Sequence, residues 1–298
     1  MPAEPRKETP MAGNDPLLPM FKWTGGKRKE LKHFCDLYPD YIRNADTEST
    51  YIEPFAGGAA AYFSLNHPGK NIINDFEPDI VNFYKKAASQ NKKMLKTVKR
   101  MEKLYSEGTH DQQEAEYYRL RNMDRPNGSG LNNISAGVRA GRFYVVNQLA
   151  FSGMRRHNSS GEFNVPFGHY KNFNPHVLTS QPHIELLKRT DIYNKSYEKI
   201  LAKNDTPKTF IFIDPPYTRV MKKYGAGDEF GEDQQRELAD QLNSLKHAHY
   251  MVVIDRSELT EELYSDNIIK TYSLKYGVNI KNRFSTDVQH IVATNYTP

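Results

Sequence analysis

The sequence contains a single cysteine, Cys35, and no long run of apolar residues. One cysteine cannot form an internal disulfide, which fits a protein of a reducing compartment. No apolar stretch approaches the roughly 20 residues that a membrane-spanning helix needs. The N-terminus also lacks the apolar core of a signal peptide. We therefore expect an intracellular protein that is neither secreted nor embedded in a membrane.

Size and composition are those of an ordinary globular protein. The 298 residues are 38% hydrophobic and 26% charged, which is enough for one large domain or two modest ones. Residues 1–20 are rich in proline and show little hydrophobic periodicity, so we predict a flexible tail there.

Positive charge is concentrated in the middle of the chain. Residues 80–175 contain 16 Lys and Arg against 7 Asp and Glu, a net +9 in a chain whose total is +5, so the remaining residues sum to −4. A basic segment on a mildly acidic frame is typical of a protein that binds a polyanion such as nucleic acid. From charge alone, a solvated lysine-rich helix face is the alternative.

One buried strand is predicted to end in an unusual turn. Residues 209–213 are β-branched or aromatic, which favours a strand buried on both faces. Asp214, Pro215, Pro216 and Tyr217 follow at once, and the two prolines can continue neither a strand nor a helix. The turn places a carboxylate, carbonyl groups and a ring at the carboxyl end of a strand, where ligands bind in open α/β sheets.

This set of groups suits a planar base with an exocyclic amine. The lone pair of such an amine is delocalised into the ring, so a carboxylate and a carbonyl that accept its N–H groups make it a better nucleophile. Asp214 and the Pro215 carbonyl fit those two roles, and stacking of a base on Tyr217 contributes about 1–3 kcal/mol. Asp-Pro-Pro by itself is equally typical of a turn after a core strand.

A second candidate site is a glycine turn. Residues 50–53 predict a strand that ends at Glu53, followed by Pro54, Phe55, Ala56 and Gly57-Gly58 and then by a helix. Such a turn lets a ligand approach the backbone closely. Asp75 ends the next predicted strand 17 residues after Gly58, where a carboxylate can accept hydrogen bonds from ribose hydroxyls. These features indicate a nucleoside-type cofactor.

Earlier in the chain, residues 21–27 contain Trp23, Gly25-Gly26 and Lys27 and precede a helix predicted to run through Leu37. Residues 80–105 have helical spacing, and further helices are expected near 117–122 and 142–151. A hairpin is predicted near 156–168, with Arg155, Arg156 and Asn158 at its entrance. Strands and helices alternate after residue 190, which argues for an α/β sheet covered on both faces.

With these motifs in this order, the sequence resembles the Dam-type DNA adenine-N6 methyltransferases over roughly residues 20–297. The resemblance is carried by Lys-Trp-Thr-Gly-Gly-Lys at 22–27, Glu-Pro-Phe-Ala-Gly-Gly at 53–58, Asn-Asp at 74–75, Gly-Glu-Phe-Asn-Val-Pro-Phe-Gly at 161–168 and Asp-Pro-Pro-Tyr at 214–217. It implies a Rossmann-like, S-adenosylmethionine-dependent methyltransferase sheet (21–79 and 176–298) with a helical DNA-recognition domain inserted at 80–175. It also implies action on duplex DNA inside a bacterium or virus-infected cell, in the cytoplasm or nucleoid, by a monomer that can act as more than one copy on DNA.

The resemblance also implies roles for individual residues. The expected cofactor-binding residues are Trp23, Lys27, Glu53, Phe55, Gly57, Asp75 and Asp214, and the expected catalytic residues are Asp214, Pro215, Pro216 and Tyr217. The expected DNA-binding residues are Ser152, Met154, Arg155, Arg156, Asn158 and Asn164. Tyr217 would stack on an adenine flipped out of the duplex. Positioning for in-line methyl transfer needs no metal.

The recognition sequence stays open between GATC and another four-base site that contains adenine. Arg156 stands where GATC-specific relatives read a guanine, but Ser152 replaces the Asn often found in the family and Met154 replaces the Leu. Three other functions also stay open: methylation of RNA adenine, methylation of a protein glutamine, and DNA binding without catalysis. Asp214 argues against glutamine methylation, which more usually pairs with Asn, and the complete glycine turn argues against a silent protein.

Overall fold

The computed structural model describes residues 14–124, 133–158, 162–217, 230–275 and 287–298, and these form a seven-stranded sheet of order β3-β2-β1-β4-β5-β7-β6. The strands are β1 (Thr50–Glu53), β2 (Lys70–Asn74), β3 (Thr190–Tyr193), β4 (Thr209–Ile213), β5 (His249–Asp255), β6 (Ile268–Lys275) and β7 (Asp287–Thr294). The first five strands are parallel, and β7 runs antiparallel between β5 and β6. This mixed α/β architecture is the predicted methyltransferase-type sheet.

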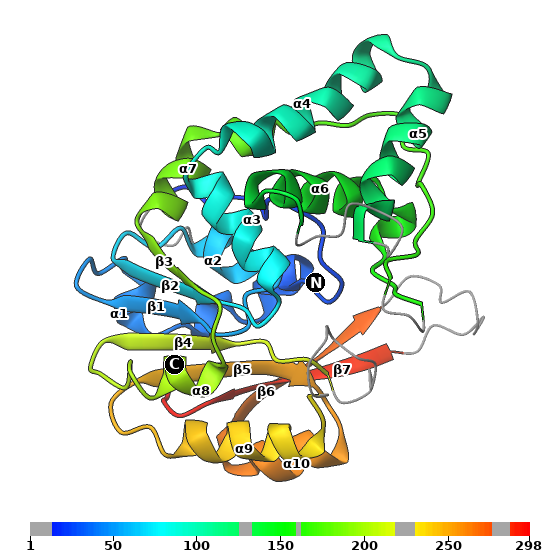
Figure 1. The fold of residues 1–298 in the computed structure, drawn as a ribbon. Helices are drawn as coiled ribbons and strands as arrows, with labels where there is room; N and C mark the ends of the chain where they lie inside the picture. Colours follow the sequence, from blue (N-terminus) through cyan, green and yellow to red (C-terminus); the bar gives the residue numbers. More distant parts are fainter. Residues whose placement is uncertain (1–13, 125–132, 159–161, 218–229, 276–286) are drawn as a thin grey trace, which may run out of the picture.

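Helices cover both faces of the sheet. They are α1 (Asp40–Arg43), α2 (Ala60–Leu65), α3 (Pro78–Ala88), α4 (Lys92–Glu107), α5 (His110–Arg121), α6 (Ala136–Leu149), α7 (Gln181–Lys188), α8 (Tyr197–Leu201), α9 (Glu232–Asn243) and α10 (Glu258–Tyr264). Short 3-10 turns are η1 (Lys27–Lys29), η2 (Leu31–His33), η3 (Cys35–Leu37), η4 (Asn122–Asp124), η6 (Phe151–Gly153), η7 (His176–Thr179) and η8 (Ser265–Asn267). In Figure 1, α9 and α10 lie below the sheet, whereas α2, α3 and α7 lie above it.

Side chains along a strand alternate between the two faces of the sheet, and this explains why helices cover both faces. All five residues of β4 are buried; Phe210 and Phe212 belong to one core cluster, and Ile211 and Ile213 belong to the other. Successive side chains of a strand point to opposite faces, so an uninterrupted apolar strand needs a helical layer on each side. The isoleucines pack with α8, α9 and α10 residues, whereas the phenylalanines face the side of the longer helical region.

The helical region α3–α6 shares its core with the sheet. One continuous cluster of buried residues runs from Phe210 to Phe83 of α3, Met94 of α4 and Phe143 of α6. Helices α4 and α6 approach closely at Gly141, where a Cβ would lie 2.6 Å from the Thr97 Cβ. Figure 1 shows α4, α5 and α6 above α3, on the side of the sheet away from α9 and α10. The division of the chain into two domains stays a prediction.

Two local predictions need correction. The expected tail lies partly outside the described residues, but residues 14–20 pack on the body of the protein: Met20 is buried, and the Leu17 N–H donates to the Phe63 carbonyl at 2.9 Å. The expected helix up to Leu37 is instead the three 3-10 turns η1, η2 and η3. Their i→i+3 bonds turn Lys27 and Glu30 inward, and both side chains are buried.

Candidate active site and cofactor site

The candidate site lies at the carboxyl ends of β1, β2 and β4. Strand β1 pairs in parallel with β2 on one side and with β4 on the other, so the strand order reverses beside β1. The crevice outside the carboxyl ends of the strands at such a reversal is the usual ligand site of an open α/β sheet. The Asp-Pro-Pro-Tyr turn, the glycine turn and Asp75 follow these three strands.

Asp214 follows β4 directly and forms the centre of the candidate catalytic turn. Lys27 Nζ donates hydrogen bonds to Asp214 Oδ1 and to the Tyr217 hydroxyl, and it lies 4.7 Å from the centre of the Tyr217 ring. Lys27 is 2% exposed, whereas the Asp214 side chain is 24% exposed. The Gln235 amide donates to the Pro216 carbonyl at 2.7 Å and fixes the far side of the turn. The predicted residues Lys27, Asp214 and Tyr217 are therefore brought together.

A second carboxylate lies behind this group. Glu30 Oε2 accepts from the Tyr272 hydroxyl at 2.7 Å and lies 2.7 Å from His290 Nδ1. Burial raises the pKa of Glu30, but the hydrogen bonds from His290 and Tyr272 and the charge of Lys27 outweigh it and leave that pKa lowered. Glu30 is therefore held as the anion, close to the amine of Lys27.

Burial raises the pKa of Asp214, and the charge and hydrogen bond of Lys27 oppose that rise. The carboxylate therefore depends on a cationic or N–H donor partner for its charge. In the structure that partner is Lys27. A ligand that offers N–H donors to the exposed part of Asp214 would satisfy the same requirement.

The glycine turn after β1 is shaped around the only tryptophan. Gly57 has φ of 46°, and a Cβ there would lie 2.6 Å from Trp23 Nε1. A Cβ on Gly58 would lie 2.8 Å from the Trp23 Cβ. The Tyr84 hydroxyl donates to the Gly57 carbonyl at 3.0 Å and holds the turn from α3. Glycine is required here because the indole of Trp23 lies directly against the turn.

Asp75 lies beside this turn, as the glycine pattern predicted. Its Oδ2 accepts from the Gly57 N–H at 2.7 Å and its Oδ1 accepts from the Glu77 N–H at 2.8 Å. Burial raises the pKa of Asp75 to about 6, against the effect of these two bonds. The neighbouring Phe76 ring is 67% exposed, which is unusual for so large an apolar side chain.

Glu53, at the end of β1, is buried beneath the glycine turn. Its Oε1 accepts from the Tyr51 hydroxyl and from the Tyr62 N–H, each at 2.6 Å. Burial raises the pKa of Glu53 to about 8, although both bonds favour the anion. The side chain therefore connects β1 to α2, behind the turn rather than in the open part of the site. The Phe55 ring lies 5.2 Å from the Tyr197 ring and 5.6 Å from the Phe230 ring.

The raised pKa of Glu53 predicts a pH-dependent stability. Between the ordinary value near 4.5 and about 8, the folded protein holds one proton more than the unfolded chain. The contribution of this proton to the free energy of unfolding is complete below pH 4.5 and is lost as pH rises through 8. The free energy of unfolding falls by at most about 1.4 kcal/mol per pH unit in that range. Urea unfolding at several pH values should show that Glu53→Gln removes this decline, because an amide does not titrate. The exposed control Glu185→Gln should keep it, and parallel curves for the two variants would contradict the assignment.

Arg155 lies on the cofactor side of the site. Its guanidinium carbon is 4.7 Å from the centre of the Trp23 ring and 5.6 Å from that of Phe143, and Nη2 lies 3.8 Å from Glu77 Oε2. The sequence grouped Arg155 with the DNA-binding residues, and that role stays a prediction. In the structure it connects the entrance of the hairpin to the glycine turn and to the segment after Asp75.

The remaining predicted DNA-binding residues gather at the hairpin. Antiparallel bridges pair Ala150 with Phe167 and His157 with Phe163, while residues 159–161 lie outside the described part of the chain. Arg156 is exposed, and its Nε donates to Asn164 Oδ1 at 2.8 Å. The Asn158 side chain donates to Glu162 Oε2 at 2.9 Å and accepts from the Glu162 N–H at 2.9 Å.

Two further residues of this set, Ser152 and Met154, are exposed on the segment that leads into the hairpin. Ser152 has φ of 53° inside η6, and Met154 is 39% exposed. Phe151 beside them is 44% exposed. Arg156, Ser152 and Met154 are thus available to a partner, whereas Asn158 and Asn164 are engaged inside the hairpin.

Several residues of the site carried no recognisable sequence signal. Tyr272 and His290 come from β6 and β7, yet both reach Glu30. Tyr84 belongs to the predicted helical pattern of residues 80–105, and only the fold places it at the glycine turn. The glycines of residues 221–231 predict a mobile loop beside the site, but this range lies outside the described residues except for Phe230 and Gly231.

The residues present fit a nucleoside-containing methyl donor. Asp75 keeps lone pairs beyond the two bonds that it accepts, so it can take ribose hydroxyls as well. The exposed Phe76 ring beside it offers a surface for a base, and the indole of Trp23 lies directly against the turn at Gly57. No helix of the described residues is long and apolar enough to cross a membrane.

Comparison with known proteins gives one consistent result. Residues 23–280 match the family described as D12 class N6 adenine-specific DNA methyltransferase. Type II methyltransferase M.CviBI of Paramecium bursaria Chlorella virus NC1A is 31% identical over 94% of this chain and 100% of its own length. Type II methyltransferase M1.LlaDCHI of Lactococcus lactis subsp. cremoris is 30% identical over 94% of this chain and 96% of its own length.

A third relative, from another bacterium, agrees with these two. The DNA adenine methylase of Haemophilus influenzae is 26% identical over 92% of both chains. The family match over residues 23–280 covers the glycine turn, Asp75, the hairpin and the Asp-Pro-Pro-Tyr turn. It confirms the predicted enzyme class over the three alternatives, which are RNA methylation, protein methylation and DNA binding without catalysis. The chain therefore belongs to the D12 class N6 adenine-specific DNA methyltransferases.

Proposed function

We propose that this DNA methyltransferase transfers the methyl group of S-adenosylmethionine to N6 of an adenine flipped out of a short duplex site. The observation that carries the proposal is the partly exposed Asp214 at the end of β4, bonded to a buried cation and next to Tyr217. A carboxylate that needs N–H donors, next to an aromatic ring, suits a planar base with an exocyclic amine. The proposed cofactor site is the neighbouring crevice formed by Trp23, the Gly57 turn and Asp75.

In this proposal the bound cofactor supplies an electrophilic methyl group, and the protein supplies position. Asp214 Oδ and the Pro215 carbonyl accept hydrogen bonds from the two N6–H groups. These bonds localise the nitrogen lone pair, so that it can attack the methyl group. Tyr217 holds the base by stacking, worth about 1–3 kcal/mol. Asp75 holds the ribose, while Glu53 and Tyr84 hold the turn from behind. The surplus proton leaves to solvent, and no metal takes part.

Lys27 then acts as an internal substitute for the substrate amine. Its ammonium group donates to both Asp214 and Tyr217, the two groups proposed to receive the adenine. Entry of the base requires this ammonium to swing away from both groups. Lys27 thus keeps Asp214 ionised between turnovers without blocking the site permanently.

Recognition is proposed to come from the hairpin, with Arg156 reading a guanine in GATC or in another four-base site that contains adenine. Asn164 holds the guanidinium in place from the facing segment. Arg155, which lies over Trp23, is proposed to join the recognition hairpin to the cofactor crevice. The enzyme is proposed to be a monomer in solution, acting inside the cell that holds its DNA substrate.

Substitution of Arg156 should relax sequence selectivity. A bidentate Arg–guanine contact contributes about 1–3 kcal/mol of discrimination, so Arg156→Ala should lower the preference for the correct site over a one-base variant by about tenfold to a hundredfold. Competing duplex oligonucleotides in one methylation assay measure this ratio. Arg119→Ala is the matched control, because Arg119 is also exposed but pairs with Glu116 on α5. Unchanged selectivity in Arg156→Ala would place the guanine contact elsewhere.

The proposed reaction is tested by incubating the protein with S-adenosylmethionine and unmethylated plasmid, then measuring N6-methyladenine in hydrolysed DNA by mass spectrometry. Digestion with methylation-sensitive enzymes for GATC and other four-base sites identifies the protected sequence. We expect N6-methyladenine at one site and no transfer to a competing RNA of the same sequence. Tight DNA binding without methyl transfer would refute the catalytic role of the Asp-Pro-Pro-Tyr turn.

A further inference from the structure

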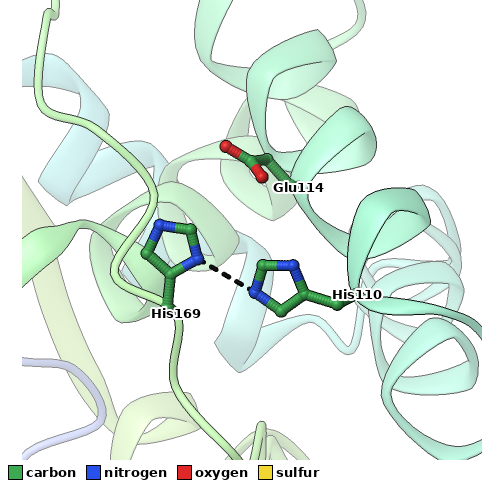
Figure 2. Close-up of side chains that lie close together, drawn as sticks. All are labelled: His110, Glu114 and His169. Carbon is green, nitrogen blue, oxygen red and sulfur yellow. Dashed lines mark hydrogen bonds between the residues drawn. The ribbon is translucent and has the colours of Figure 1, made fainter.

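Outside the catalytic site, two histidines and a glutamate converge on the surface of the helical region. His110 is the first residue of α5, Glu114 lies one helical turn later, and His169 follows the hairpin. His110 Nε2 lies 2.9 Å from His169 Nδ1, and one ligand atom from each of the three side chains lies within 4.8 Å of the others. Figure 2 shows the Glu114 carboxylate beside the two rings. This is the one such group among the residues that the structure describes.

The two imidazoles are held by their surroundings. Their rings stack with a centroid separation of 4.9 Å and an interplanar angle of 11°. Both rest on the buried Phe167 ring, at 5.7 Å from His110 and 5.1 Å from His169. Thr109 caps α5 with reciprocal bonds to Gln112, which fixes the start of the helix that bears His110. The ring nitrogens are therefore directed at each other by the fold.

The backbone at His169 adds to this arrangement. His169 has φ of 50°, which few residues other than glycine adopt. Gly168 before it bonds through its N–H to the Leu149 carbonyl at 2.8 Å, and a Cβ there would lie 2.4 Å from the Tyr170 ring. The chain thus bends sharply where it brings His169 back to α5, and nothing in the methylation chemistry calls for that bend.

We propose that His110, Glu114 and His169 bind a divalent transition-metal ion, with Zn²⁺ as the expected ion. Two imidazole nitrogens and one carboxylate oxygen form a donor set that Zn²⁺ accepts, with water in the fourth position. The i, i+4 spacing of His110 and Glu114 places both ligands on one face of α5. At Zn–N distances of about 2.0–2.1 Å, tetrahedral ligands lie about 3.3 Å apart, so the two imidazole nitrogens need to separate by a few tenths of an ångström. Both rings also need to turn so that these nitrogens face one ion, and the carboxylate needs to move closer.

A metal at this position would cross-link α5 to the segment that follows the recognition hairpin. The hairpin itself is already tied to α5 by the Tyr117 hydroxyl, which donates to the Val165 carbonyl at 3.0 Å. The site is separate from the carboxylates and lysine of the methyl-transfer site and takes no part in that reaction. Its effect is to hold the base of the hairpin against α5, so metal binding should stabilise the helical region.

The test is isothermal titration of the full chain, freed of metal with a chelator, with a zinc salt alone. We expect one Zn²⁺ per chain, at least tenfold weaker binding in His110→Gln and in His169→Gln, and severalfold weaker binding in Glu114→Gln. The exposed His176, on η7 and outside the group, supplies the control His176→Gln, which should bind like the unmodified protein. Circular dichroism checks that each variant is folded.

Thermal unfolding supplies a second measurement. Saturating Zn²⁺ should raise the midpoint of the unmodified protein and of His176→Gln, but not that of His169→Gln, because a ligand stabilises only the state that binds it. Failure of the unmodified protein to bind Zn²⁺, or binding by His110→Gln and His169→Gln as tight as that of the unmodified protein, would show that the two imidazoles merely share a hydrogen bond. Either result would overturn the proposal.

Discussion

Replacing Asp214 with alanine should lower the rate of methyl transfer about a thousandfold while DNA affinity stays within about tenfold. The carboxylate is proposed to accept an N6 hydrogen, and loss of one preorganised polar group at a reacting centre costs about 10²–10³ in rate. Asp214 lies at the end of β4, apart from the exposed hairpin residues, so the substitution should leave the DNA contacts in place. Single-turnover transfer of labelled methyl groups and a DNA-binding titration measure the two quantities.

The controls for Asp214 separate chemistry from stability. Alanine leaves the buried Lys27 without its carboxylate partner, which destabilises the fold as well. Asp214→Asn keeps an oxygen acceptor of the same shape and should retain more transfer than alanine. Asp191→Ala, on the exposed surface of β3, removes a carboxylate elsewhere and should leave the rate unchanged. Equal loss of DNA binding and methylation in Asp214→Ala would contradict the proposed role.

Replacing Gly57 with alanine should weaken S-adenosylmethionine binding by at least about tenfold, which corresponds to about 1.4 kcal/mol. Two causes act together. The residue has φ of 46°, and the new Cβ would lie 2.6 Å from Trp23 Nε1 and push the indole out of its place. The Gly57 N–H that holds Asp75 would shift with it. Calorimetric titration with the cofactor, in the absence of DNA, measures the loss.

Gly25→Ala is the matched control for this experiment. Gly25 also has a positive φ, of 79°, but a Cβ there meets no atom within 4 Å. The left-handed conformation costs about 1–2 kcal/mol for a residue other than glycine, so both variants lose some stability. Only Gly57→Ala should also lose cofactor affinity. Equal affinity in the two variants would show that Trp23 does not shape the cofactor site.

The strongest predictions from sequence were those with a local physical cause. Five consecutive β-branched or aromatic residues favour a strand buried on both faces, and β4 spans those residues, Thr209–Ile213. Pro215 and Pro216 end that strand because they cannot continue it, which places Asp214 at the sheet edge. The glycine turn and Asp75 were predicted as neighbours for a similar reason: parallel strands that follow one another end at the same edge.

Features that depend on distant residues could not be read from the sequence. Lys27 and Asp214 are 187 positions apart, and no pattern links them. Burial of Lys27 and Glu30 helps explain why residues 27–37 form three tight turns instead of the predicted helix: long-range partners override a weak local preference. The same holds for Arg155, whose neighbours over Trp23 are set by how the hairpin packs and not by its own flanking residues.

The position of β7 has a consequence for how the enzyme is made. This strand is the last of the chain, yet it fills the gap between β5 and β6 and carries His290, which reaches back to Glu30 across 260 positions. A nascent chain on the ribosome therefore exposes an open edge of β5 until the residues of β7 have been made. During that interval Glu30 lacks its partner His290, so the group of side chains behind Lys27 is incomplete. We therefore expect methyl transfer to begin only after β7 has joined the sheet.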